Sequence, residues 1–178
     1  TKANYTGYVA WRLTVPREKL PKDIMELVGA VWCGPKNHAV IYWLCSGNLL
    51  NFVGCPAHEA WEDESWNQVR PWEELKAAYA GWHPKVQAII DAVDHTQCYR
   101  WALNNRAPIN NWSTARATLL GDAAHPTTQY MAQGACMAME EGLAGSGAID
   151  AGKKSASNFA THTGNMEYIN GLGGLNDF

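Results

Sequence analysis

The chain has 178 residues, of which 47% are hydrophobic and 17% are charged, and its formal net charge is -3 at pH 7. This length predicts one domain, or one domain with an appendage, and the composition excludes a wholly disordered chain. The excess of acidic residues excludes a global positive field for nucleic acid. Since no run of 18 apolar residues and no signal-peptide pattern occurs, we expect a cytoplasmic protein without a membrane partner.

Metal sites and disulfide scaffolds are not indicated. The five cysteines form no CxxC pair and no Cys/His pair at metal-finger spacing. His58 and His83 lie near several acidic residues, but the spacing of metal ligands is missing. We therefore expect a solvated acidic loop around His58 and no bound metal.

The first half of the chain predicts strands. Residues 5–15 are rich in aromatic and β-branched residues, and 28–33 and 39–45 have the same character. Residues 46–48, Ser-Gly-Asn, separate the last of these from another apolar run at 49–54, as a hairpin turn does. An antiparallel sheet is therefore expected.

The hydrophobic spacing becomes helical in the middle of the chain. The i, i+3, i+4, i+7 pattern predicts two helices, at 72–79 and 86–93. Two further strands are expected at 98–103 and 117–120, and a helix at 132–141. The order of these elements predicts an α+β fold, with a mixed, mostly antiparallel sheet and flanking helices.

Three segments of different character follow from this pattern. Residues 1–115 contain the predicted sheet and two helices, and residues 116–142 form a strand, a loop and a helix. Residues 143–178 are glycine-rich and show no sustained hydrophobic period. We expect this last segment to be a surface tail.

The segment 119–140, LLGDAAHPTTQYMAQGACMAME, carries the most chemical information. Asp122 can accept hydrogen bonds from sugar-like hydroxyls, Pro126 stiffens the loop, and Gly134 allows the backbone to approach a flat ligand. Free amides at the start of the predicted helix can stabilise a developing anion. The same residues also fit a simpler interpretation, in which Asp122 caps a turn and Gly134 only packs closely.

GDAAHP, Gln133-Gly134 and the following Met139-Glu140-Glu141 resemble the second flavin-binding motif of the aromatic-ring flavoprotein monooxygenases. Two further patches are similar to that family, a YxGxxAxR strand at 5–12 and a WxLxxRxPxxxW run at 101–112. The resemblance implies hydroxylation of a small aromatic acid, in the catabolism of aromatic compounds. FAD would be the cofactor, and NAD(P)H and O2 the co-substrates.

The resemblance also implies roles for residues of the flavin motif. By position, Asp122 would hold the ribityl chain of FAD, and Pro126 would lie beside the isoalloxazine ring. Backbone amides near Gln133 and Gly134 would face the pyrimidine end of the flavin. The complete set of cofactor-binding residues predicted in this way is Gly121, Asp122, Pro126, Gln133, Gly134 and Ala135.

Within this family the chain is most similar to the hydroxylases of 3-hydroxybenzoate, salicylate and 6-hydroxynicotinate, because GPxxHxxxY at 34–42 matches their substrate strand. His38 and Tyr42, four residues apart on a strand, face one side. His38 is the candidate base for the phenol proton, and its ordinary pKa of about 6.5 suits that role. The resemblance implies that Gln129 positions the substrate. Alternatively, His38 and Tyr42 lie on a half-buried sheet face, and their polar atoms only make hydrogen bonds within the protein.

The chain departs from the family pattern at both ends. It contains no GxGxxG after an N-terminal strand, and no DG motif precedes Tyr5. We therefore expect a fragment that lacks the ADP-binding half. Self-association, or a second chain that supplies the missing half, is expected. The alternative is a non-catalytic remnant that binds aromatic acid or flavin only in part.

Overall fold

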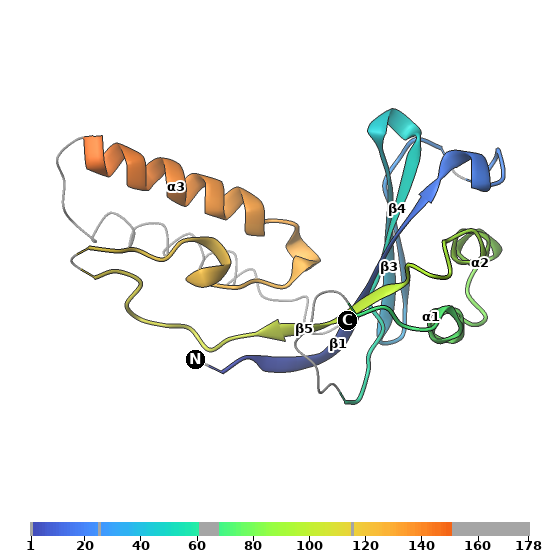
Figure 1. The fold of residues 1–178 in the computed structure, drawn as a ribbon, viewed down its shortest axis with the longest axis horizontal. Helices are drawn as coiled ribbons and strands as arrows, with labels where there is room; N and C mark the ends of the chain where they lie inside the picture. The colour runs from blue at the N-terminus through green and yellow to red at the C-terminus, as the bar shows by residue number, and fades with distance from the viewer. Residues whose placement is uncertain (1, 25, 61–67, 115, 151–178) are drawn as a thin grey trace. The chain divides into compact units, whose positions relative to one another are not determined.

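The computed structural model describes residues 2–24, 26–60, 68–114 and 116–150 (Figure 1). The chain divides into two compact units, which are considered separately below. The first, Tyr5–Asn104, is called the sheet unit. The second, Asn105–Phe178 with Thr1–Asn4, is called the loop–helix unit.

The sheet unit is built on five strands in the order β2-β3-β4-β1-β5. The pairs β2–β3, β3–β4 and β1–β4 are antiparallel, and in Figure 1 β5 runs opposite to β1. The open antiparallel sheet confirms the predicted fold class. The strands are β1 (Asn4–Pro16), β2 (Ala30–Gly34), β3 (Asn37–Leu44), β4 (Leu49–Gly54) and β5 (Tyr99–Asn105).

Two helices cover one face of this sheet, α1 (Trp72–Ala78) and α2 (Pro84–Asp91), and both predicted helices are thereby confirmed. Pro84 occupies the first turn of α2, where its missing N–H costs nothing. Large apolar side chains from both layers are fully buried between them, and removal of their surface from water stabilises the unit. The largest of them are Trp11, Tyr79, Phe52, Ile41, Leu50, Leu75, Ile89 and Ile90.

The opposite face of the sheet is called the open face, because α1 and α2 both lie on the other side. Alternation along β3 shows the two faces, since Ala39 and Ile41 are buried whereas His38, Val40 and Tyr42 are only partly buried. A small second apolar cluster lies on this face. It consists of Ala10, Cys55 and Leu103, with Tyr8, Val53 and Trp101 packed against them.

The loop–helix unit contains two short 3-10 turns, Gly121–Ala123 and Gln129–Met131, followed by α3 (Gly134–Asp150). The strand predicted at 117–120 is wrong. Within the described residues this stretch makes a single isolated bridge, between Ser113 and Thr118. Leu119 and Leu120 are about two-fifths exposed, at 42% and 41%, so no partner strand draws these apolar side chains into a sheet.

The helix predicted at 132–141 exists with different ends. It begins at Gly134, because Ala132 has a left-handed backbone with φ of 51°. It continues to Asp150, so residues 143–150 of the expected irregular tail are helical. The rest of that tail lies outside the described residues. None of the described helices is both long enough and apolar enough to cross a bilayer.

Candidate functional site

His38 and Tyr42 lie on the open face of the sheet unit, as their spacing predicts. In the strand register His38 is paired with Cys33 of β2, and Tyr42 with Asn51 of β4. Partial burial of the imidazole lowers the pKa of His38 below its ordinary value, because burial disfavours the charged form. His38 is therefore neutral at pH 7 and able to accept a proton.

The backbone of His38 is fixed from the helix side of the sheet. Its carbonyl oxygen accepts hydrogen bonds from the Cys55 amide (2.8 Å) and from the Tyr79 hydroxyl (2.9 Å). Tyr79 is fully buried, and its hydroxyl reaches the carbonyl over Gly54, where any Cβ would collide with the phenol. Tyr79, at the C-terminal end of α1, thus fixes the backbone of the candidate base, His38, from the helix side of the sheet.

The turn before His38 is also held by the helices. Lys36 has a left-handed backbone, with φ of 52°, and the side-chain amide of Asn37 donates through Nδ2 to the carbonyl oxygen of Ala78 (2.9 Å). A Cβ on Gly34 would lie 2.9 Å from the Trp82 ring, so only glycine allows this approach. The Gly34-Pro35 turn therefore serves to dock β2 and β3 on the helical layer.

We expect Tyr79→Phe to lower the free energy of unfolding of the chain by about 1–3 kcal/mol, because the phenyl ring keeps its packing while a buried hydrogen bond is lost. Urea unfolding measures this change. Tyr8→Phe is the matched control, because Tyr8 is half-buried. Its effect should stay within about 0.5 kcal/mol. Equal stability of the two variants would show that the bond to His38 adds nothing.

The GDAAHP loop of the loop–helix unit is packed tightly on α3. Gly121 is buried with φ of +53°, and a Cβ at this position would lie 3.0 Å from the Cβ of Ala138. Both the positive φ and the short separation favour glycine. The Gly121 amide donates to the Glu141 carboxylate over 2.9 Å.

Glu141 also pairs with His125, so a single carboxylate of α3 holds two points of the loop. The Glu141 Oε1 and His125 Nε2 atoms are in direct contact, and the two side chains are only 6% and 10% exposed. The Trp112 ring lies on the imidazole, with the ring centroids 5.0 Å apart. In the sequence Glu141 stands out only as part of a motif, because nothing in an acidic pair that continues a helix indicates that one of the two carboxylates is buried.

The solvent side of the same loop presents polar groups. Asp122 is exposed, and its carboxylate has no hydrogen bond to any residue that the structure describes. The first helical hydrogen bond of α3 joins the Met137 amide to Gln133 (2.9 Å), so the amides of residues 134–136 precede the helical ladder. Of the other predicted cofactor-binding residues in this stretch, Pro126 and Gly134 are partly buried. Gln133 and Ala135 are exposed.

These groups fit FAD. A free carboxylate can accept hydrogen bonds from ribityl hydroxyls, and unbonded helix amides can donate to an anionic or carbonyl oxygen. All six predicted cofactor-binding residues fall within one loop and the start of α3. Gln129, in the second 3-10 turn, belongs to this unit and is exposed, whereas His38 and Tyr42 belong to the sheet unit.

A sheet covered on one face by two helices, together with a GDAAHP turn packed on a helix, corresponds to a segment of the FAD-dependent aromatic hydroxylases, to which the chain is homologous. It is 41% identical over 142 residues to 3-hydroxybenzoate 6-hydroxylase of Polaromonas naphthalenivorans, which covers 79% of this chain and 34% of that protein. It is 37% identical over 142 residues to 6-hydroxynicotinate 3-monooxygenase of Pseudomonas fluorescens, covering 78% and 36%. No protein-family model matches the chain.

Solved structures show the same fold. HpxO of Klebsiella pneumoniae, complexed with FAD and uric acid, is 29% identical with a TM-score of 0.61, over 78% of this chain and 34% of that one. A salicylate hydroxylase substrate complex has a TM-score of 0.65 at 22% identity, over 76% and 36%. The chain spans about a third of the length of the relatives that it matches.

Proposed function

We propose that this chain is part of a flavoprotein monooxygenase that uses FAD and NAD(P)H to hydroxylate a small aromatic acid, such as a hydroxybenzoate. The observation that carries the proposal is the two-sided loop at 121–135. Glu141 holds it from the buried side, and Asp122 and the first amides of α3 are presented on its exposed side. The similarity to hydroxybenzoate and hydroxynicotinate hydroxylases supports the same function.

In this proposal the loop–helix unit supplies the flavin motif, residues 116–142, and residues 1–115 supply the substrate region. Asp122 accepts hydrogen bonds from the ribityl hydroxyls, Pro126 lies beside the flavin ring, and Gln133, Gly134 and Ala135 present backbone amides to its pyrimidine end. When bound, FAD takes reducing equivalents from NAD(P)H and activates O2. The protein's contribution is to hold, orient and shield it.

The sheet unit prepares the substrate. His38 accepts the proton of the substrate's ring hydroxyl, which raises the electron density of the ring carbon to be hydroxylated. The lowered pKa of His38 keeps its imidazole neutral, and so receptive, at neutral pH. Tyr42, on the same strand face, and Gln129 orient the ring.

A chimaera tests the function directly. Residues 5–141 of this chain replace the matched segment of the Polaromonas 3-hydroxybenzoate 6-hydroxylase, and the parent enzyme is the control. The chimaera should keep a visible flavin absorbance band after desalting and should form hydroxylated product with NAD(P)H. A folded, colourless chimaera would contradict the flavin role and favour the non-catalytic binding module.

Within this chimaera, Asp122→Ala should weaken FAD binding by about 1–3 kcal/mol, because charge-assisted hydrogen bonds to the ribityl chain are lost. Titration of the apoprotein with FAD, followed by fluorescence, measures the change. Asp23→Ala removes an exposed carboxylate from the sheet unit and should leave the affinity unchanged. Equal FAD affinity of the two variants would remove Asp122 from the flavin site.

A further inference from the structure

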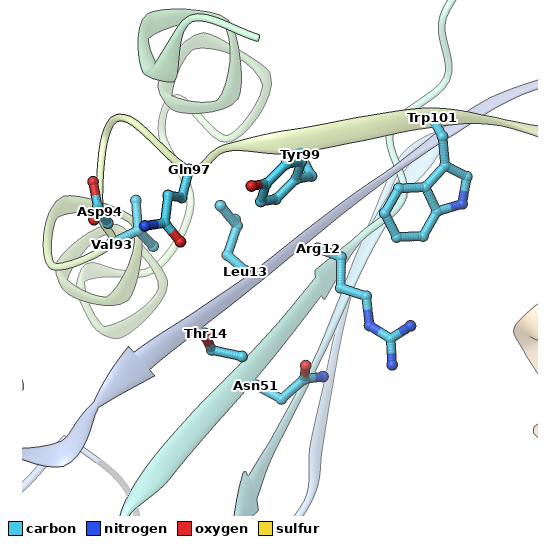
Figure 2. A pocket seen from close by; sticks show the side chains of 9 residues that line it. All are labelled: Arg12, Leu13, Thr14, Asn51, Val93, Asp94, Gln97, Tyr99 and Trp101. Carbon is cyan, nitrogen blue, oxygen red and sulfur yellow. The ribbon is translucent and has the colours of Figure 1, made fainter. Parts of the chain in front are cut away.

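The sheet unit has a cavity of about 440 Å³, which is lined by residues other than His38 and Tyr42. Figure 2 shows side chains of β1, β4 and β5 and of the segment before β5 around it. Its volume falls in the range that holds small ligands. No residue of the cavity has a role in the hydroxylation proposed above, and all of them belong to the sheet unit.

Three hydrogen-bond donors line the floor of the cavity. Arg12 is exposed, and its guanidinium makes no hydrogen bond or ion pair with another described residue. Thr14 follows it on the same face of β1, and Asn51 is its register partner on β4. Asn51 is only 2% exposed, and its Nδ2 is buried without a hydrogen-bond partner within the described part of the chain. A buried, unpaired amide is costly, and an acceptor from a ligand would satisfy it.

Two aromatic side chains stand over these donors. Tyr99 and Trp101 are two residues apart on β5 and therefore face the same side of the sheet. In Figure 2 both rings lie on the side of β5 that faces Arg12. They offer flat apolar surface to a ring.

The positive and negative side chains that line the cavity, Arg12 and Asp94, lie at opposite ends of it. Asp94 lies at the end away from Arg12 (Figure 2), and its carboxylate accepts hydrogen bonds from the Thr96 amide (2.9 Å) and hydroxyl (2.6 Å). These two bonds lower the pKa of Asp94, which stays ionised. An anionic group is thereby favoured at the Arg12 end and disfavoured at the other.

We propose that this cavity binds a small aromatic carboxylate. Its carboxylate accepts hydrogen bonds from Arg12 and Asn51, and its ring packs against Tyr99 and Trp101. The site depends on neither flavin nor His38, although it shares the open face with His38, because Tyr42 is the register partner of Asn51 on β3.

Titration of the full chain with benzoate, followed by NMR, tests the site. Arg12→Gln should weaken benzoate binding about 10- to 100-fold, the worth of a hydrogen bond to a charged group. Lys85→Gln removes an exposed cation from α2 and should leave the affinity within about twofold. Benzyl alcohol, which keeps the ring and lacks the charge, should bind much more weakly than benzoate. Failure of benzoate to bind, or unchanged binding by Arg12→Gln, would overturn the proposal.

Two further variants separate this site from the one proposed for hydroxylation. Asn51→Leu keeps the branched shape of the side chain and removes the unpaired donor, so it should weaken benzoate binding in a chain that still folds. If His38→Ala abolished binding and Arg12→Gln did not, the carboxylate would lie at His38, and the Arg12 cavity would be excluded while the hydroxylation proposal stood.

Discussion

His38→Ala in the FAD-loaded chimaera should lower the turnover of hydroxybenzoate about 10²- to 10⁴-fold, the usual contribution of a positioned general base. The imidazole lies on the open face, while the backbone carbonyl of His38 is held by the Cys55 backbone amide and, from the helix side, by the Tyr79 hydroxyl. Removal of the ring therefore deletes the base and leaves the strand in place. Steady-state rates of NAD(P)H oxidation coupled to product formation measure the loss.

The pH profile gives an independent signature of this base. Burial lowers the pKa of His38, so turnover should rise with pH through a midpoint below about 6.5, and this limb should vanish in the variant. The free energy of unfolding should also rise with pH. Protonation of the buried imidazole opposes folding, so the free energy of unfolding that depends on His38 is fully present above about pH 6.5 and falls as the pH is lowered toward the folded-state pKa.

His95→Ala is the control for both measurements, because His95 is an exposed histidine of the same unit that stacks on Trp72. Its turnover should stay within about twofold of the parent. Parental turnover of His38→Ala would leave His38 as a packed histidine of the sheet.

Glu141→Ala should lower the free energy of opening of the GDAAHP loop by about 3–5 kcal/mol, the usual cost when one partner of a buried pair is removed. The change leaves the Gly121 amide and His125 Nε2 without their acceptor in a buried place. Native-state hydrogen exchange of residues 121–125 measures it. FAD affinity of the chimaera should fall as well, because Asp122 follows Gly121 directly.

Glu140→Ala provides the matched control, since it removes the neighbouring carboxylate of the same helix from an exposed position. Exposed pairs contribute about 1 kcal/mol or less. Glu141→Gln keeps one acceptor oxygen and should give an intermediate loss. Equal exchange rates in the two alanine variants would show that Glu141 does not hold the loop.

The sheet unit could be predicted from the sequence because its strands are separate runs of apolar and β-branched residues bounded by turn residues. The same rule failed at 117–120, where a short apolar run has exposed leucines and lacks a partner strand in the described region. The helix end at 141 was also wrong. Gly142, Gly145 and Gly147 lower helix propensity, but propensity is a weak prior, and α3 continues through them to Asp150.

The arrangement of the candidate site residues could be predicted only where these residues are close in sequence. His38 and Tyr42 share a strand face, and Asp122 and Gly134 lie in one loop and at the start of the helix that follows it, so spacing and motif were sufficient to place them. The contact of Tyr79 with His38 joins residues 41 apart, and that of His125 with Glu141 joins residues 16 apart. No local pattern encodes these pairs, because folding of the surrounding elements creates them.

The position of β1 in the sheet has a consequence for synthesis. Of the five strands in this sheet, β1 is made first, yet it lies between β4 and β5, and the Thr6 hydroxyl donates to the carbonyl oxygen of Leu103, 97 residues later (2.7 Å). One edge of β1 therefore stays unpaired on the ribosome until almost the whole unit has emerged. During that interval its backbone is open to foreign strands, and such long-range closure is slow. A nascent chain stalled before Tyr99 should thus be a preferred chaperone client, whereas one released after Asn105 has every strand that it needs.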